Sequence, residues 1–300
     1  MYKGVLYMLL SSLCFAVINI FVKTLTNSYD FLSDIQEIQN YPAFELVFFR
    51  SVVSLSICMA IIRRKKIPFF GNNKKWLLIR GISGATALTC FFITLKHLPL
   101  AIATTVQYLS PIFTILFAIK LQKESVKPIQ WIFFAVSFSG VAFLGLAGEK
   151  SLHIDPKWLL LGLFSAVISG IAYNAIMKCR NTDQPVTIVM YFPLVATPVM
   201  LVLSLVTGFV VPVGIEWLLL IGIGALTQVA QITMTRAFHA DVAARVTPIK
   251  YVGAIYAVAA GFFIFDETLG LYSSLGIILV LLGVLLNTFL KQMKWFTPKS

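Results

Sequence analysis

Residues 241–286 read DVAARVTPIKYVGAIYAVAAGFFIFDETLGLYSSLGIILVLLGVLL, and this stretch decides how the chain is organised. It consists of two apolar runs separated by an acidic pair, Asp266-Glu267. Residues 100–144 have the same layout and read LAIATTVQYLSPIFTILFAIKLQKESVKPIQWIFFAVSFSGVAFL. The residues that coincide at a shift of 143 positions are Tyr251 with Tyr108, Glu267 with Glu124, and Gly283 with Gly140. Three matches at one offset predict an internal duplication.

The composition is that of an integral membrane protein. Hydrophobic residues make up 59% of the chain, charged residues 12%, and the mean hydropathy is +0.89. A soluble domain carries about a quarter of charged residues. Because one span needs about 20 apolar residues, the chain has room for roughly ten helices. The first run, Gly4 to Val22, is too long for a signal-peptide core and lacks an A-x-A site, so we expect it to be a retained helix.

The apolar runs predict an all-α protein with ten transmembrane helices. The predicted helices cover residues 3–23, 44–62, 75–96, 100–121, 129–147, 157–178, 187–207, 215–236, 242–265 and 271–290. They divide into two five-helix repeats, residues 1–150 and 151–300. Because each repeat has an odd number of helices, the second repeat must be inverted. Inverted repeats are typical of secondary transporters, which bind their solute near the midplane between the halves.

Basic residues at the helix ends predict the orientation. With the N-terminus in the cytoplasm, the inner loops hold sixteen Lys and Arg residues and the outer loops hold four. Cytoplasmic loops collect these residues, so we expect both termini inside. The Glu124 hinge is then cytoplasmic, whereas Asp266 and Glu267 form an external hinge that we expect to be solvated. The acidic Asp30–Tyr41 loop also suits the outer face, as a short interfacial helix or a disordered loop.

Some basic residues lie within predicted spans, where a charge needs a partner, a cavity or a function. Arg50 lies about a third of the way down the second helix, and its nearest acid, Glu45, points to another side. We therefore expect its partner, or a solute, on another helix; a snorkelling or structural role is the alternative. Arg80 is close to Lys74-Lys75, and we expect it to snorkel; contact with the solute is the alternative. Lys250 is too deep to snorkel easily and is the first candidate for a solute ligand.

Polar residues in the spans complete the candidate site. The predicted substrate-binding residues are Lys250, Arg50, Tyr251, Tyr108, Gln107, Gln228, Gln231, Asn19 and Asn174. The alternative for the uncharged members is interhelical hydrogen bonding without contact to a solute. Asn19 and Asn174 are equivalent at a second offset of 155, four residues before Lys23 and Lys178 respectively. Glu45, near the outer mouth, is the one plausible intramembrane carboxylate, and Arg245 is a further basic residue of the ninth helix.

Several kinds of chemistry are disfavoured by missing patterns. The sequence has no H-E-x-x-H, P-loop or G-x-S-x-G motif, so we expect neither an enzyme nor ATP-driven transport by this chain alone. The four cysteines have no CxxC spacing, and we expect no metal and no cofactor. The net charge of +12 is explained by topology rather than by nucleic-acid binding.

Particular segments resemble the EamA group of the drug/metabolite transporter superfamily. These are Phe48-Phe49-Arg50, the stretch YLSPIFTILFA at 108–118, the Glu124 hinge with Trp131 to Gly140, and the mirrored FDETL and LGVLL of the second half. The resemblance covers essentially the whole chain and implies a ten-helix transporter. AFELVFFRS and TPIKYVGAIYAVAAGFFIFDE are most similar to the S-adenosylmethionine uptake branch.

The hypothesis from sequence is a secondary transporter that moves a small polar metabolite by alternating access. S-adenosylmethionine or an amino-acid-like solute, with an anionic group facing Lys250, is the first expectation. The alternatives are amino-acid or drug efflux by the same fold and, in another class, a membrane-embedded enzyme or a structural protein. Expected partners are the solute, the lipid bilayer and a coupling proton or exchanged solute, in a monomer or homodimer of the bacterial inner membrane.

Overall fold

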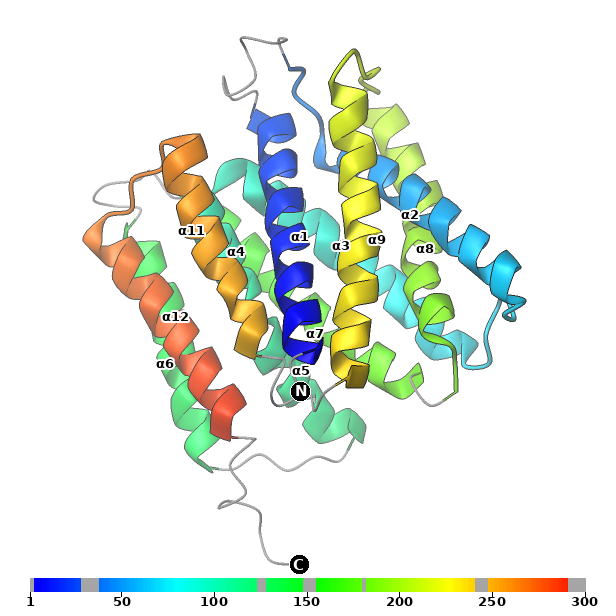
Figure 1. Cartoon of the computed structure of the whole chain (residues 1–300). Coiled ribbons are helices and arrows are strands. Elements are labelled where there is room, and N and C mark those ends of the chain that lie inside the picture. The colour runs from blue at the N-terminus through cyan, green and yellow to red at the C-terminus, as the bar shows by residue number, and fades with distance from the viewer. Residues whose placement is uncertain are drawn as a thin grey trace, which may run out of the picture.

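The computed structural model describes residues 3–27, 38–122, 128–147, 155–179, 182–240 and 248–290, and these ranges form a bundle of helices without strands (Figure 1). The helices are α1 (Lys3–Asn27), α2 (Ala43–Lys65), α3 (Lys74–His97), α4 (Leu100–Gln107), α5 (Ser110–Gln122), α6 (Pro128–Ala147), α7 (Pro156–Cys179), α8 (Pro185–Thr207), α9 (Glu216–Ala240), η2 (Pro248–Tyr251), α11 (Val252–Phe265) and α12 (Leu271–Leu290). Three sequence predictions, the Glu124 hinge, Arg245 and most of the Asp30–Tyr41 loop, lie outside the described residues.

The ten predicted spans are confirmed in the described ranges. Eight stretches are long and apolar enough to cross a bilayer, and the shorter apolar helices Ile249–Phe265 and Leu271–Asn287 supply two more. A helix of about 20 residues is about 30 Å long, which matches the hydrocarbon core. We call the end of the bundle where α1 begins and α12 ends the lower end, and the opposite end, where α1 ends and α2 begins, the upper end (Figure 1).

Proline marks the start of many of these helices. The prolines at or directly before a first helical residue are Pro42, Pro99, Pro128, Pro156, Pro185 and Pro248. Proline suits this position because its fixed φ is helical and because the first backbone N–H groups of a helix have no intrahelical partner. Proline thus marks in the sequence where a new helix starts after a short connection.

The helix pairing agrees with two inverted repeats. α1 of the first half packs on α9 of the second, and the pair equivalent to it by the repeat is α7 of the second half on α3 of the first. In the same way, α3 packs on α8 and α9 packs on α2. Three further pairs join equivalent helices of the two halves: α2 with α8, α4 with α11, and α6 with α12. Each half therefore contributes its helices to contacts with the other half, and the interface between them runs through the centre of the bundle.

The fourth span is interrupted, and the ninth changes helix type at the equivalent place. The predicted helix over residues 100–121 is present as one apolar span, with an interruption in the middle, because α4 ends at Gln107 and α5 begins at Ser110. Pro111 lies at the start of α5, where it cannot donate a hydrogen bond back to residue 107. Tyr108 has φ −69° and ψ −4°, and its counterpart Tyr251, the last residue of η2, has φ −74° and ψ −9°. Tyr108 thus follows the end of α4, and Tyr251 lies where the 3-10 helix η2 passes into α11.

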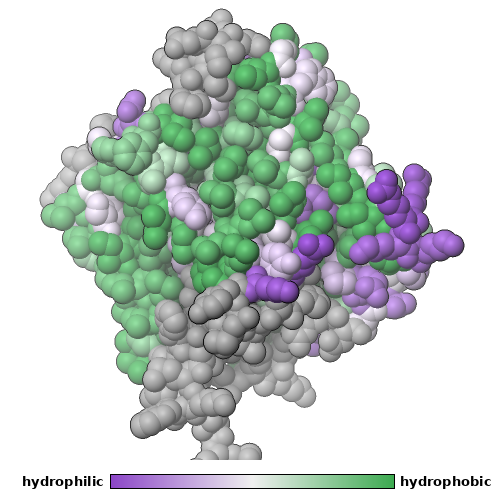
Figure 2. All heavy atoms as spheres, in the orientation of Figure 1, coloured by the Kyte–Doolittle hydropathy of each residue, from purple (hydrophilic) through white to green (hydrophobic). Residues whose placement is uncertain are grey.

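The outer surface suits a lipid environment. Hydrophobic residues cover most of the face seen in Figure 2. Exposed side chains on different helices include Leu6, Val206, Leu218 and Phe263, which are between 65% and 80% exposed. A soluble protein rarely exposes such a continuous apolar surface. The basic run Arg63–Lys66, at the lower end of α2, is exposed, as expected for residues outside the hydrocarbon core.

Candidate functional site

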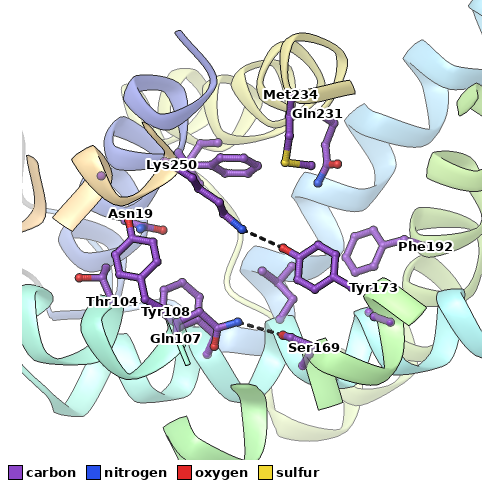
Figure 3. Close-up of a pocket in the computed structure, with 18 of the residues that line it drawn as sticks. Asn19, Thr104, Gln107, Tyr108, Ser169, Tyr173, Phe192, Gln231, Met234 and Lys250 are labelled. Carbon is purple, nitrogen blue, oxygen red and sulfur yellow. Dashed lines mark hydrogen bonds between the residues drawn. The ribbon is translucent and has the colours of Figure 1, made fainter. Parts of the chain in front are cut away.

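A cavity of about 210 Å³ lies at the centre of the bundle (Figure 3). Its wall is formed by α1, α2, α3, α4, α7, α8, α9, η2 and the start of α11, so both repeats contribute. Phe15, Phe91 and Phe92 belong to the apolar part of the wall, and a limited set of polar and basic side chains interrupts it. This combination of apolar walls with a few polar groups is typical of small-molecule sites.

Gln107, the last residue of α4, and Lys250, in η2, both line this cavity. The two residues are equivalent at the offset of 143, and each precedes one of the duplicated tyrosines. Lys250 Nζ donates a hydrogen bond to the Tyr173 hydroxyl at 3.1 Å, and Gln107 Nε2 donates to Ser169 Oγ at 2.9 Å (Figure 3). Tyr173 and Ser169 are one turn apart on α7. The fourth and ninth spans therefore each present a polar side chain to the same helix.

Two arginines lie against one phenylalanine ring on another part of the wall. The guanidinium carbons of Arg50 and Arg80 are 5.2 and 5.7 Å from the centroid of Phe192. Arg50 Nε also donates to Thr227 Oγ1 on α9 at 2.8 Å, so the expected partner on another helix is present. Among the described residues, Arg50 Nη1 and Arg80 Nε have no hydrogen-bond partner. The two buried cations therefore keep unused donor capacity beside the cavity.

The prediction that Arg80 snorkels to the lower end is wrong. Arg80 is only 9% exposed and lines the cavity. Its guanidinium lies over Gly84, one turn further along α3, where a side chain would collide with it. Phe192 of α8 covers the same guanidinium. The absence of a Cβ at residue 84 and the aromatic face supplied by another helix together direct Arg80 toward the centre of the bundle.

Six of the nine predicted site residues line the cavity, and three do not. The six are Lys250, Arg50, Tyr108, Gln107, Gln231 and Asn19. Tyr251 is buried beside the cavity and packs edge to face on Tyr108, with 5.3 Å between ring centroids. Gln228 accepts a hydrogen bond from Ser54 at 2.8 Å and joins α9 to α2. Asn174 Nδ2 donates to the Thr114 carbonyl at 2.9 Å and joins α7 to α5.

Tyr173, Ser169 and Phe192 are wall residues that were not predicted from the sequence. Ser169 and Tyr173 are four positions apart and therefore share a helix face with Ser165, which donates to Gln107 at 3.0 Å. The spacing of these hydroxyl groups along α7 is the feature of the sequence that could have predicted a polar face toward the cavity. Phe192 had no comparable signal, because one aromatic residue in an apolar run is indistinguishable from a packing residue. Its role is visible only once Arg50 and Arg80 are placed on its ring.

The upper end of the bundle is closed by a buried ion pair. Lys23 Nζ donates to Glu267 Oε1 and also to the Leu98 carbonyl at 2.9 Å. Glu267 accepts from the Leu100 N–H at the start of α4 at 2.8 Å. Lys23 is one turn above Asn19 on α1, and Leu100 is one turn above Thr104 on α4, so the pair lies directly above the cavity wall.

The prediction that the Asp266-Glu267 hinge is solvated is therefore wrong for Glu267. Its side chain is 8% exposed, because Asp266 adopts a left-handed conformation, with φ 50°, and turns the chain back on α11. The Glu267 N–H donates to the Gly261 carbonyl at 2.9 Å in this turn. The carboxylate then meets both Lys23 and the N-terminus of α4, two positive groups that offset the cost of its burial.

Glu45, predicted to be the one plausible intramembrane carboxylate, is buried, and a second carboxylate near it is buried as well. Glu45 and Glu216 are fully buried near the upper end. Glu216 accepts hydrogen bonds from the Tyr41 hydroxyl at 2.6 Å and from the Gln39 N–H at 2.7 Å. Burial and the neighbouring charge of Glu216 raise the pKa of Tyr41, so its hydroxyl stays a donor. These contacts hold the chain before α2 against the start of α9 and add to the closed upper end.

The fold and the central cavity define a polytopic membrane protein with the architecture of a solute carrier. The model of the EamA-like transporter family matches residues 2–146 and 156–289, and the chain belongs to this family. The resemblance predicted from the sequence is thereby confirmed.

Individual relatives are transporters with different named solutes. The chain is 31% identical over 267 residues to a pseudopaline exporter of Pseudomonas aeruginosa, covering 88% of each chain. It is 22% identical to an S-adenosylmethionine uptake transporter of Rickettsia prowazekii, covering 75% of this chain and 76% of that one. A crystal structure with 18% identity superposes with a TM-score of 0.64 and covers 99% of this chain and 98% of the other, which supports the fold.

Proposed function

We propose that the protein is a secondary transporter that carries a small organic anion through the central cavity by alternating access. The observation that supports this most directly is the charge of the cavity wall. Arg50, Arg80 and Lys250 contribute three cations, and the described part of the wall contains no Asp or Glu. Charged side chains inside a membrane are costly, and they are retained where they bind solutes or one another. A solute with negative charge would offset that cost.

The charge of the wall discriminates between the solutes expected from sequence. S-adenosylmethionine carries a sulfonium and an ammonium group against one carboxylate, so its net charge is positive at neutral pH. Moving it into a cavity with three cations and no wall carboxylate would add like-charge repulsion in a medium of low dielectric. An acidic amino acid or another organic acid would instead gain charge-assisted hydrogen bonds from Lys250 and the arginines. The proposed function therefore favours an organic anion.

Closure of the upper end supports alternating access as the mechanism. In this conformation, Lys23 and Glu267 seal the bundle one turn above the cavity wall. Large, fully buried side chains on the neighbouring helices, Leu25, Leu46, Leu95 and Leu100, thicken the same barrier. We propose that the solute exchanges with the lower end in this state, and that opening the upper end requires the ion pair to separate. The inverted repeats provide two related arrangements for such a change.

The distribution of basic residues supports an orientation. If the lower end is cytoplasmic, the exposed run Arg63–Lys66 and the pair Lys74-Lys75 face the cytoplasm, as the positive-inside rule favours. The upper end, with its sealed ion pair, would then face the exterior. We propose a bacterial inner membrane as the location, in line with the two bacterial relatives.

Untargeted exchange tests the transporter proposal with many candidate solutes at once. Proteoliposomes would be loaded with a small-molecule cell extract, diluted into the same extract carrying a stable-isotope label, and sampled by mass spectrometry. We expect labelled organic anions to enter faster than in liposomes carrying Lys250→Gln. Gln228→Leu is the matched control, because Gln228 bonds between helices outside the cavity. Equal entry of every solute in both preparations would overturn the proposal.

A further inference from the structure

Arg50 and Arg80 are buried cations of the cavity wall that keep hydrogen-bond donors without acceptors. Arg50 is 6% and Arg80 is 9% exposed, and each retains a guanidinium nitrogen without a hydrogen-bond partner among the described residues. Their neighbours include the Thr227 hydroxyl and the aromatic rings of Phe92 and Phe192. None of these groups carries a negative charge. A guanidinium fork is shaped to bind a carboxylate or phosphate through two parallel hydrogen bonds.

Lys250 occupies a separate position. Its Nζ bonds to the Tyr173 hydroxyl and lies 5.1 Å from the centre of the Tyr173 ring. The arginines lie instead on the ring of Phe192. In the view of Figure 3, Tyr173 lies between Lys250 and Phe192. The ammonium thus lies at one aromatic ring, and the two guanidinium groups share another, Phe192; Arg50 also lies 6.0 Å from the ring centroid of Phe92.

We infer that Arg50 and Arg80 form a second anion subsite, so that the transported solute carries two oxyanion groups, one bound by the arginine pair and one by Lys250. Each group would be a carboxylate or a phosphate. This inference rests on the proposed function and narrows it to dianionic solutes. Tyr173 and Phe192 form apolar faces along which the body of the solute lies between its charged ends. The cavity volume of about 210 Å³ suits a short solute.

The two neighbouring guanidinium groups should lower the stability of the protein when no solute is bound. Two buried guanidinium groups on one ring repel each other when no anion is bound, so replacing one of them should stabilise the solute-free state. A purely structural arginine would behave in the opposite way, because its removal leaves packing and hydrogen bonds unmade. Arg80→Gln is the suitable variant, since Arg50 also bonds to Thr227 and has a structural contact to lose.

Thermal unfolding of the purified full-length protein in detergent tests both parts of the inference. The probes are pairs whose first member carries two oxyanion groups and whose second carries one: succinate with succinamate, glutarate with glutaramate, and 3-phosphoglycerate with glycerate, all at constant ionic strength. We refer to the two members as the dianion and the monoanion, and we expect the dianion of at least one pair to raise Tm by at least about 3 °C more than its monoanion. Whether the dicarboxylates or the phosphate ester give the larger shift distinguishes the two kinds of oxyanion.

Variants separate the second subsite from the first. In Arg80→Gln we expect the difference between dianion and monoanion to disappear and the Tm of the solute-free protein to rise. Lys74→Gln is the matched control, because it removes one positive charge from an exposed position on the same helix and should retain the wild-type pattern. Equal shifts with monoanions and dianions, or no shift with any probe, would overturn the inference. So would an Arg80→Gln protein that is destabilised yet keeps the dianion preference.

A result that overturns the second anion subsite can be distinguished from a result that overturns transport of an organic anion. Equal shifts that are abolished by Lys250→Gln would leave a transporter with a single anion site. The exchange assay with Lys250→Gln decides the transport activity itself and does not depend on the arginine pair.

Discussion

Breaking the Lys23–Glu267 ion pair should open the upper end of the bundle. Glu267→Gln removes the charge that compensates Lys23, which is left with the Leu98 carbonyl, and it weakens the acceptor for the Leu100 N–H. Both side chains are almost fully buried, so the uncompensated ammonium should cost about 3–5 kcal/mol. If the cost falls on the closed state alone, the ratio of open to closed molecules rises by about 100- to 5,000-fold.

The double variant measures how much of this cost belongs to the pair. Lys23→Met should destabilise the closed state less than Glu267→Gln does. The reason is that the Glu267 carboxylate keeps its hydrogen bonds to the N-terminus of α4. Combining both changes should recover about 2–3 kcal/mol relative to the sum of the single changes, since no unpaired charge remains.

The assay is the accessibility of the cavity from the upper end. A single cysteine at Leu88, a partly buried wall residue, would be introduced after Cys14, Cys58, Cys90 and Cys179 are replaced by alanine. Its reaction with a membrane-impermeant maleimide would be followed in intact cells. We expect slow labelling of the parent, at least about tenfold faster labelling of Glu267→Gln, and intermediate labelling of the double variant. Unchanged labelling together with an unchanged Tm would refute the closing role of the pair.

Three further variants separate binding from packing. Tyr173→Phe removes the acceptor that holds Lys250, so KM for the transported solute should rise about 3- to 10-fold with the amount of folded protein unchanged; an unaltered KM would show that Lys250 needs no such support. Gln228→Leu should lower stability by about 1 kcal/mol, because two interhelical contacts are lost, and a collapse of transport would instead place Gln228 in the site. Gly276→Leu should lower Tm strongly, because a Cβ there would lie 2.8 Å from the Gly140 carbonyl of α6, and a wild-type Tm would contradict this close packing of α6 and α12.

The duplication was predictable from the sequence because it left matching residues at fixed offsets. Tyr108 and Tyr251 aligned at 143 positions, and in the structure they pack edge to face, Tyr108 after the end of α4 and Tyr251 at the end of η2. The positions of Gln107 and Lys250 in the cavity follow from the same offset. Hydropathy was sufficient to predict the number of spans, because the backbone of each apolar run must make its hydrogen bonds within one helix in the membrane.

Side-chain direction could not be predicted in the same way. Arg80 turns to the centre because Gly84 makes room and Phe192, far away in the sequence, provides an aromatic face. Glu267 is buried because one left-handed residue reverses the chain and because Lys23 approaches from α1. Both outcomes depend on groups brought together only by tertiary packing, and neither has a local signature in the sequence.

Counterflow into proteoliposomes tests the central claim, that the basic cavity is the transport site for an organic anion, most directly. The label would be the anion exchanged most rapidly in the untargeted assay, and wild-type protein would be compared with Lys250→Gln shown to be folded by its Tm. Loss of one charged hydrogen bond at the site, about 2 kcal/mol, predicts saturable exchange whose kcat/KM falls by about 30-fold or more in the variant. Equal exchange by the two proteins, or a preference for cationic solutes, would contradict the account.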